Sequence, residues 1–409
     1  MQRILRWIVF TSLAWGVFAP YARADFQLTD AIKEFGERRF VDLPPARLKA
    51  GPVIVHPSMR NKVEYDSNVF LEDTDGKKDT IFEVLPGVVL DLPVNKHRVT
   101  VGYEADMEFF GKGRDRTQND QNQNFFTLAN FHFTNGYVNV LEQLSETSGR
   151  AGTTFTSRIP RYDQSIYPKI GYRWKRLIFE EGFRHQVRDF RRQVDDSLDF
   201  QFTEWTSVIF YDLFARLKAL VEYQLAQIDY DDSPTRQGTF NQFRIGLEGQ
   251  PLPNLTTKIR IGPQFRNYQT SSKPDFYSWV ADMSVEYQVR KNWKVSLDLT
   301  RKAVEATFFD IAYYKQHLAG VGIAYRIRPA WEVFTKTRVY RQDYAERATV
   351  GSQTGYRHDR YFNIKTGLRY EPRDWMQFEL AYELARRHSN FSTFGYTDHI
   401  ISLSSALLY

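Results

Sequence analysis

The residues that most often carry out catalysis or bind metal ions are scattered through this sequence without a catalytic spacing. The eight histidines are His56, His97, His132, His185, His317, His358, His388 and His399, and cysteine is absent. No two histidines have the helical spacing of a metal-dependent protease, and neither a nucleophile elbow nor a phosphate-binding loop occurs. The sequence therefore predicts a protein that is not an enzyme, with no catalytic residue, no metal site and no cofactor. A hydrolase whose serine or histidine meets an acid only in the folded chain stays open as an alternative.

One short stretch has a weak likeness to a calcium loop. Asp73, Asp75 and Gly76 place two carboxylates at alternate positions before a glycine, which is an arrangement that can wrap a cation that prefers oxygen ligands. The rest of the calcium-loop spacing is missing, and aspartate and glycine are also the ordinary residues of exposed turns. We therefore predict an exposed turn at this position.

Charged side chains at every second position are the more informative feature. Arginine or lysine in the middle of a bilayer costs about 2–4 kcal/mol, so charged positions of this kind must face a watery or protein-filled interior. The predicted pore-lining residues are Glu104, Asp106, Glu108, Arg184, Arg188, Arg260, Arg266, Lys336, Arg338, Lys365 and Arg369. They line a route for a solute or form a salt-bridge lattice that holds the wall in shape, and the two roles are compatible. Nearby, Tyr268 and Tyr340 either stack against sugar rings or pack in the wall.

The pattern that positions these charges runs from about Pro52 to Tyr409. Apolar and polar residues alternate with a period of two in runs of strand length, rich in aromatic and β-branched residues. Short connections alternate strictly with long polar ones. The short connections cover residues 93–97, 134–136, 174–176, 214–216, 251–254, 290–292, 328–330 and 372–374. The longest polar connection covers residues 345–359.

This layout predicts an all-β fold, a transmembrane antiparallel up-and-down β-barrel of about 18 strands. It has short periplasmic turns and longer extracellular loops, with 16 strands as the fallback. The aromatic residues support the orientation, because Trp174, Trp293, Trp331 and Trp375 each lie beside a short turn, as in the aromatic girdle of a barrel. The last strand ends at Tyr409, which resembles the C-terminal signal that barrel assembly machinery recognises.

The N-terminal segment predicts export. Residues 1–24 combine basic Arg3 and Arg6, an apolar stretch and a small-residue cleavage site, which is the pattern of a cleavable signal peptide. Residues 25–51 form a periplasmic lead-in or plug segment, and residues 52–409 form the barrel. The net charge of +6 falls by three to +3 when the arginines of the signal are removed, which argues against nucleic-acid binding. The predicted location is the bacterial outer membrane, in contact with its lipid and lipopolysaccharide.

The start of the barrel carries a family resemblance. The stretch from Gly51 to Pro93, and above all Tyr65-Asp66-Ser67-Asn68, resembles a β-barrel porin family associated with exopolysaccharide export and exosortase-linked polysaccharide loci. The resemblance implies a channel or accessory for export of a secreted polysaccharide, working with periplasmic polysaccharide-export proteins. From the residues themselves, Asp66 and Asn68 are expected to shape the top of the first hairpin. The alternatives are a general or sugar-specific nutrient porin with an inward-folded loop, and an outer-membrane hydrolase.

Overall fold

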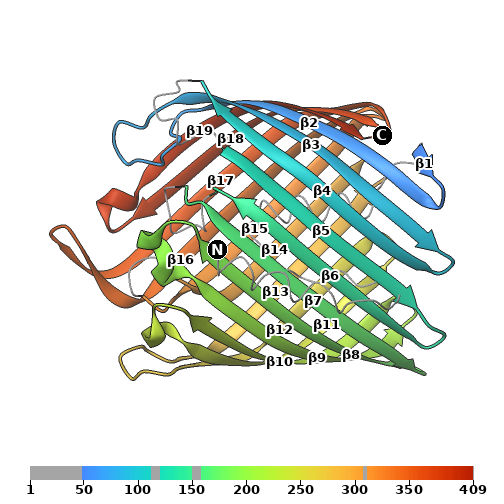
Figure 1. The fold of residues 1–409 in the computed structure, drawn as a ribbon, viewed down its shortest axis with the longest axis horizontal. Coiled ribbons are helices and arrows are strands. Elements are labelled where there is room, and N and C mark those ends of the chain that lie inside the picture. Colours follow the sequence, from blue (N-terminus) through green and yellow to red (C-terminus); the bar gives the residue numbers. More distant parts are fainter. Residues whose placement is uncertain (1–47, 112–119, 150–157, 307–310, 409) are drawn as a thin grey trace.

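The chain folds into a closed antiparallel β-barrel (Figure 1). The computed structural model describes residues 48–111, 120–149, 158–306 and 311–408. Each strand from β2 onward pairs with its neighbours in chain order, and β2 pairs with β19 to close the wall. Strands β2 to β19 thus form the predicted barrel of 18 strands, and the fallback of 16 strands is wrong. No helix in the described part of the chain is long and apolar enough to span a membrane.

The first half of the wall comprises β1 (Leu48–Ala50), β2 (Val53–Asp66), β3 (Asp79–Val94), β4 (His97–Phe110), β5 (Asp120–His132), β6 (Gly136–Thr147), β7 (Arg161–Trp174), β8 (Leu177–Phe190), β9 (Phe200–Phe214) and β10 (Leu217–Tyr230). The second half comprises β11 (Gly238–Leu252), β12 (Leu255–Tyr268), β13 (Phe276–Arg290), β14 (Trp293–Glu305), β15 (Tyr313–Arg328), β16 (Trp331–Val350), β17 (Gln353–Arg373), β18 (Met376–Ser389) and β19 (Tyr396–Leu408). Among the described residues, three short 3-10 helices lie in the loops, η2 (Gln193–Leu198), η3 (Pro234–Arg236) and η4 (Ser392–Phe394).

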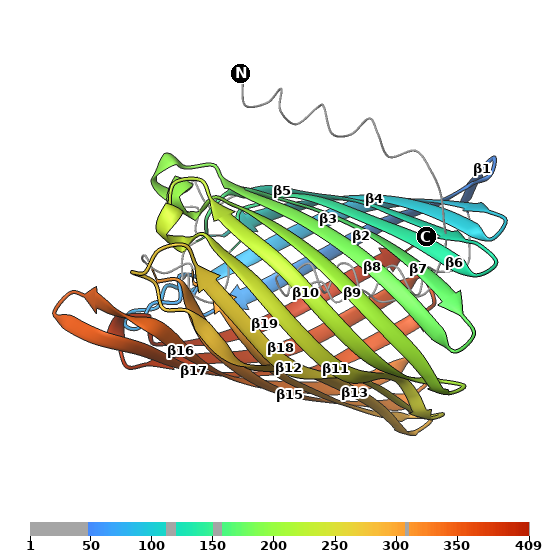
Figure 2. The same ribbon diagram turned by 90° about the horizontal axis from the view of Figure 1, so that it is seen from below.

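The eight predicted short turns all join neighbouring strands at one end of the barrel, and the long loops lie at the other end (Figure 2). Asn95 and Lys175 have positive φ angles of 54° and 55°, which is the backbone that a two-residue hairpin needs. By the usual orientation of such barrels, the short turns mark the periplasmic end and the loops the extracellular end.

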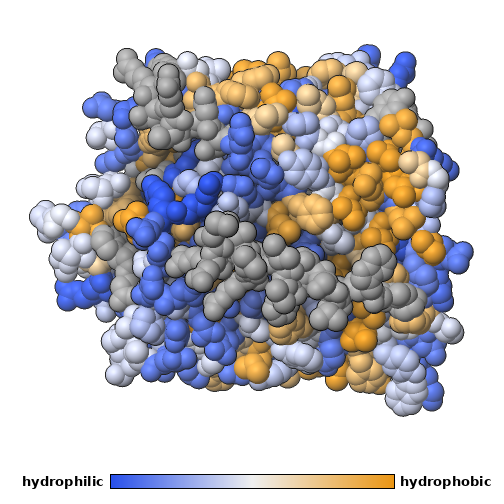
Figure 3. All heavy atoms as spheres, viewed as in Figure 1, coloured by the Kyte–Doolittle hydropathy of each residue, from blue (hydrophilic) through white to orange (hydrophobic). Residues whose placement is uncertain are grey.

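Successive residues of a strand point to opposite faces, so each strand has an outward and an inward set. On β2, Val63 and Tyr65 are exposed apolar or aromatic residues, whereas Lys62 and Glu64 at the alternate positions point inward and pair with each other. Apolar side chains gather over the part of the wall nearer the short turns, and hydrophilic ones toward the loops (Figure 3). The alternation places an apolar surface against lipid and the charges inside.

The prediction of a long loop over residues 345–359 is wrong. β16 and β17 continue as a paired hairpin to a turn at Gly351, where φ is +59°, and this hairpin projects beyond the other loops (Figure 1). Thr349 and Thr354 are hydrogen-bonded across it at 2.9 Å. Above the membrane a strand needs no apolar outer face, so the pattern there loses the alternation by which strands were recognised.

The end of the predicted lead-in contributes to the sheet. Leu48, Lys49 and Ala50 of β1 pair with Val55, Ile54 and Val53 of β2, and the turn is made by Gly51 with φ of 64°. The predicted signal peptide, most of the lead-in and Tyr409 lie outside the described residues. The signal peptide, the role of the lead-in and the assembly signal at Tyr409 therefore stay predictions.

Candidate functional site

The inward face of the barrel carries a lattice of ion pairs that cross between strands. On the β2 side, Arg60 reaches over β3 to Glu104 of β4 at 2.5 Å, and the Glu104 side chain is only 1% exposed. Lys62 contacts Glu83 of β3 at 3.0 Å as well as Glu64. Glu104, Glu83 and Glu64 are therefore each paired with a base of β2.

A second part of the lattice lies on β10 to β13. Glu222 pairs with both Arg244 and Arg260, the latter at 3.0 Å. Arg260 also contacts Glu248 at 2.9 Å, and Arg244 contacts Asp282 at 2.9 Å. Two arginines on adjacent strands are thus held by three carboxylates, with Glu222, which is 3% exposed, at the centre.

A third part lies on β16 to β18. Arg369 contacts Glu332 at 2.5 Å and Glu379 at 3.0 Å, and Lys365 contacts the other oxygen of Glu379 at 3.1 Å. These pairs lie toward the periplasmic turns, whereas Arg188 and Arg161 hold Asp163 at 2.5 and 2.9 Å near the extracellular end of β7 and β8. The lattice therefore covers the wall over its whole height.

All eleven residues predicted to line the pore lie on the inward face. Among those not yet placed, Glu108 pairs with Arg158, Asp106 accepts a hydrogen bond from Asn122 at 3.4 Å, and Arg184 donates one to Gln186 at 2.9 Å. Arg266 pairs with Glu305 at 2.5 Å. The side chains of Lys336 and Arg338 lie beside Gly322 and Gly320 of β15. A Cβ atom at either glycine would be in van der Waals contact with them. The salt-bridge role is thus realised for most of this set, and contact with a solute stays a prediction.

The two inward tyrosines pack against other rings. Tyr268 stacks in parallel on Tyr313 with 6.1 Å between ring centroids, and Tyr340 meets Tyr361 edge to face at 5.9 Å. Tyr268 is 8% exposed. Of the two roles left open for these rings, wall packing is the one that the contacts support.

Loops at the extracellular end of β10 to β19 pack against one another. Inward-facing tyrosines at the ends of these strands are nearly inaccessible, namely Tyr230, Tyr268, Tyr314, Tyr344 and Tyr361. Ala306, Ile311 and Ala312 of the β14–β15 connection are at most 2% exposed. Ile311 packs in a cluster with Tyr344 of β16, and Phe394 of the β18–β19 loop packs against the same cluster. We call these connections, together with the β10–β11 and β12–β13 loops, the loop cluster.

Buried cations tie the loop cluster together. Arg236 of η3, 1% exposed, lies over the Tyr230 ring at 4.0 Å and donates a hydrogen bond to the carbonyl of Ala306. Lys273 of the β12–β13 loop pairs with Glu346 of β16 at 3.2 Å, and Glu346 also accepts the backbone N–H of Ala312 at 2.7 Å. Loops from four hairpins are joined in this way.

Arg357 is the most enclosed of these cations. It forms a two-bonded pair with Asp359 at 3.0 and 2.6 Å, and both side chains are fully buried. Its guanidinium lies between the rings of Tyr344 at 4.8 Å and Phe394 at 3.8 Å. Arg357 therefore fixes the β18–β19 loop against the β16–β17 hairpin.

Sequence reasoning missed Arg236, Lys273 and Arg357, because all three fell in stretches assigned to exposed loops. A weak signal did exist for one of them. Arg357 and Asp359 are two apart, so they share a face if the segment is a strand. That spacing becomes informative only once residues 345–359 are recognised as a hairpin.

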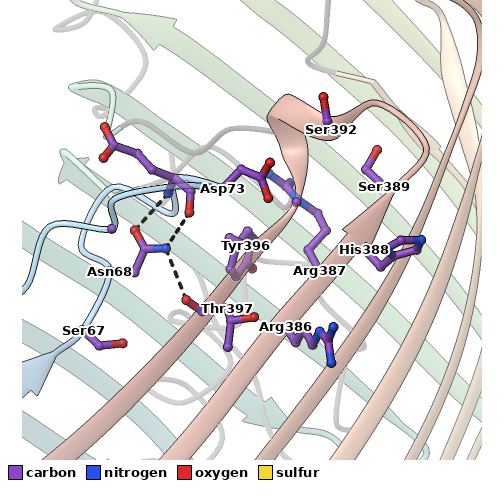
Figure 4. A pocket seen from close by; sticks show the side chains of 13 residues that line it. Ser67, Asn68, Asp73, Arg386, Arg387, His388, Ser389, Ser392, Tyr396 and Thr397 are labelled. Atoms are coloured by element: carbon purple, nitrogen blue, oxygen red, sulfur yellow. Dashed lines mark hydrogen bonds between the residues drawn. The ribbon is translucent and has the colours of Figure 1, made fainter.

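A cavity of about 450 Å³ lies at the seam where the barrel closes (Figure 4). Asn68 is central to it: its side chain donates hydrogen bonds to the carbonyls of Glu72 at 2.7 Å and Thr397 at 3.2 Å, and its side-chain oxygen accepts the N–H of Glu72. Asp66 accepts the N–H of Asn68 at 2.7 Å. The expectation that Asp66 and Asn68 shape the top of the first hairpin is confirmed.

The structure shows where the histidine and acidic side chains that could bind a metal ion or act in catalysis lie. Within the described residues no group of three or more histidine, aspartate or glutamate side chains could hold a metal ion, and Asp73 and Asp75 lie in an exposed turn. His358 does meet an acid, with its Nδ1 2.7 Å from Asp343, but both point outward from the wall. The inward acid–histidine pair that the hydrolase alternative requires is not formed by these two residues.

The four tryptophans of the predicted girdle lie at the short-turn end. Trp174, Trp293 and Trp331 are 53%, 39% and 37% exposed at strand ends, and Trp375 lies in the β17–β18 turn. Trp293 packs against Tyr325 at 4.6 Å and Trp331 against Tyr370 at 4.2 Å. Large exposed amphipathic rings at one level suit a membrane–water interface.

Asp199 gives the extracellular β8–β9 loop a pH response. Burial raises the pKa of Asp199 to about 7, an N–H donated by Phe190 opposes the rise, and nearby aspartates add to it. Because the folded pKa lies above that of a free aspartate, the loop loses stability as pH rises from about 4 to 7. The protection of residues 191–199 against hydrogen exchange, corrected for the base-catalysed intrinsic rate, should therefore fall over this range. Asp199→Asn should remove this fall in protection, and an unchanged fall in that variant would assign the response to another group.

Comparison with known proteins agrees with this architecture. The family model described as "Putative beta-barrel porin 2" matches residues 191–407, and a search of curated protein sequences gave no match. The stretch 51–93 that carried the resemblance lies outside the matched range.

Among solved structures, one with a TM-score of 0.50 shows the same fold, and others are similar at slightly lower scores. The outer membrane protein OpdK of Pseudomonas aeruginosa is 10% identical, with 87% of this chain and 99% of that chain covered and a TM-score of 0.50. The same protein with vanillate gives 0.49 at 10% identity, with 87% and 99% covered, and OpdQ of Pseudomonas aeruginosa gives 0.49 at 8% identity, with 88% and 100% covered.

At these identities the likeness to OpdK concerns the fold, an outer-membrane barrel. The family match covers just over half of the chain, in the part that includes β9 to β18 and most of β19. The chain therefore belongs to the family "Putative beta-barrel porin 2" and is an outer-membrane β-barrel porin.

Proposed function

We propose that this porin is a passive channel through which small hydrophilic solutes enter the cell. The observation that carries the proposal is an inward face of paired charges, with the packed loop cluster at its extracellular end. A porin of 16–18 strands encloses an aqueous channel. Loops packed against one another over that channel limit the size of what can pass, as the nutrient-porin alternative requires.

The charge pattern bears on which solutes pass. Glu222 with Arg244 and Arg260, and Arg369 with Glu332 and Glu379, combine both signs within single contacts. Paired charges leave a weak net field, so the lumen has little power to sort ions by sign. Neutral polar solutes such as small sugars fit this lining best.

Export of a secreted polysaccharide is the other role that the sequence suggested. Tyr268 and Tyr340 could have stacked against sugar rings, but their rings pack against Tyr313 and Tyr361 instead. The packed loop cluster also opposes the exit of a polymer. The export hypothesis therefore rests on the resemblance at residues 51–93 alone, and we place uptake first.

Liposome swelling tests the proposal. Vesicles containing the folded protein should admit monosaccharides faster than disaccharides and exclude long oligosaccharides. If no sugar enters, or if deletion of the gene abolishes surface polysaccharide while sugar uptake is unchanged, the uptake proposal fails and export takes its place.

Selectivity gives a residue-level prediction. Glu222→Gln removes the carboxylate between Arg244 and Arg260 and leaves a surplus of positive charge on the inward face. We expect the reversal potential in a salt gradient to shift toward anion selectivity in planar bilayers. Glu181→Gln is the matched control, because Glu181 points outward beside Trp205 and should leave the reversal potential unchanged. Equal shifts in both variants would contradict a role for the inward lattice in selectivity.

A further inference from the structure

The outer surface of β15 to β18 carries bases directly opposite one another at the extracellular side. Along one line of cross-strand partners, His317 faces Arg341, Arg341 faces Arg360, and Arg360 faces His388. Arg386 lies two residues before His388 on the same face. We call Arg341, Arg360, Arg386 and His388 the outer cationic patch.

These side chains point outward. The residues next to the patch along each strand face inward and are deeply buried: Gln342, Asp359 and Arg387 are at most 2% exposed. The outward positions two residues nearer the turns, Val339 next to Arg341 and Phe362 next to Arg360, are 44% and 39% exposed and belong to the lipid-facing surface. In Figure 4, Arg387 points toward Tyr396, whereas Arg386 and His388 lie apart from it.

The patch lies at the upper edge of the hydrocarbon layer. Arg341 follows Trp331 of the periplasmic girdle by ten residues and Arg386 follows Trp375 by eleven. At about 3.3 Å per residue and a tilt near 40°, this distance is about 25 Å, which matches the height of the apolar band of such barrels. The charged groups are therefore level with the lipid headgroups of the outer leaflet.

Within the protein the charges of the patch are incompletely balanced. Like charges directly opposite on neighbouring strands are destabilising. Asp343 supplies one negative charge, which contacts Arg341 at 3.0 Å and His358 at 2.7 Å. No ion pair to Arg360 or Arg386 occurs within the residues that the structure describes. Arg360 and Arg386 are therefore exposed cations that an anion from outside can reach.

We propose that the outer cationic patch binds the phosphate groups of a phosphorylated glycolipid of the outer leaflet. Guanidinium groups bind phosphate oxygens through paired, charge-assisted hydrogen bonds, and several bases at headgroup level can hold a lipid carrying more than one phosphate. The exposed apolar residues below the patch, including Val339 and Phe362, offer a surface for its acyl chains. This site is on the outside of the wall and is independent of what passes through the lumen.

The test measures binding of lipid A with two phosphates to the full-length barrel in neutral detergent. Arg360→Ser with Arg386→Ser should weaken binding about fivefold per arginine, about 25-fold together. Arg360→Lys with Arg386→Lys should keep most of the affinity. The matched control, Arg191→Ser with Arg192→Ser, removes two exposed arginines from the opposite extracellular rim and should bind like the unaltered protein.

Two further arms identify the source of the phosphate. Lipid A stripped of phosphate should bind the unaltered protein as weakly as intact lipid A binds the double serine variant, and inorganic phosphate at the same concentration should not displace intact lipid A. Equal binding of the two lipids, displacement by inorganic phosphate, or full affinity in a double serine variant that keeps the heat-modifiable mobility of a folded barrel would each overturn the proposal.

Discussion

Gly262→Ala is expected to separate β11 from β12 and to yield a barrel that folds poorly or not at all. A Cβ atom at Gly262 would lie 1.8 Å from the carbonyl oxygen of Phe243 and 2.9 Å from the Cα of Arg244, so backbone rather than a flexible side chain must move. The regular pairing of β11 with β12 is interrupted there: Pro263 has no N–H to donate, and Phe243 and Arg244 have no register partners on β12. Forced overpacking of this kind costs about 1–3 kcal/mol or more.

Urea unfolding followed by tryptophan fluorescence would measure the loss, and heat-modifiable mobility would report the folded fraction. The same substitution at Gly355 is the matched control, since nothing lies within 4 Å of a Cβ placed there. It should unfold like the unaltered protein. A Gly262→Ala barrel of ordinary stability would mean that the two strands can part at little cost.

Arg357→Ala is expected to open the extracellular end. The variant leaves Asp359 fully buried without its partner and empties the space between the Tyr344 and Phe394 rings. Breaking a buried ion pair by removing one member costs about 3–5 kcal/mol. The β16–β17 hairpin and the β18–β19 loop should then separate, which raises single-channel conductance and exposes residues 345–359 to protease.

Two further variants separate opening from general damage. Arg347→Ala removes an exposed arginine from the same hairpin and should change neither conductance nor protease resistance. Arg357→Met with Asp359→Leu removes both charges while keeping bulk, so it should stay closer to the unaltered conductance than Arg357→Ala does. Unchanged conductance in Arg357→Ala, with the hairpin cut by protease, would show that this hairpin does not restrict the channel.

The fold was predictable because a membrane imposes its pattern locally. Val63 and Tyr65 must face lipid and Lys62 must not, so strand, face and turn can be read from a few neighbouring residues. The same rule stops at the membrane edge. Above it, Arg357 and Asp359 are buried by contact with loops that are distant along the chain, and no local pattern records such contacts.

The candidate site shows the same limit. Alternation placed Glu104 and Arg260 on the inward face, but their partners, Arg60 two strands away and Glu222 also two strands away, depend on the register between strands. Register follows from the paired backbone and not from residue type alone. The sequence could therefore indicate that charges gather inside, while the structure was needed to show which acid pairs with which base.

The seam held by Asn68 bears on the order in which the protein is built. Asn68 reaches Thr397, 329 positions further along the chain, and Ser67 contacts Asp398, 331 positions away. Neither contact can exist until nearly the entire polypeptide has been delivered and laid down strand by strand. These bonds are consequently among the last to form, and they fasten the first hairpin of the barrel to β19 only after the strands between them are in place.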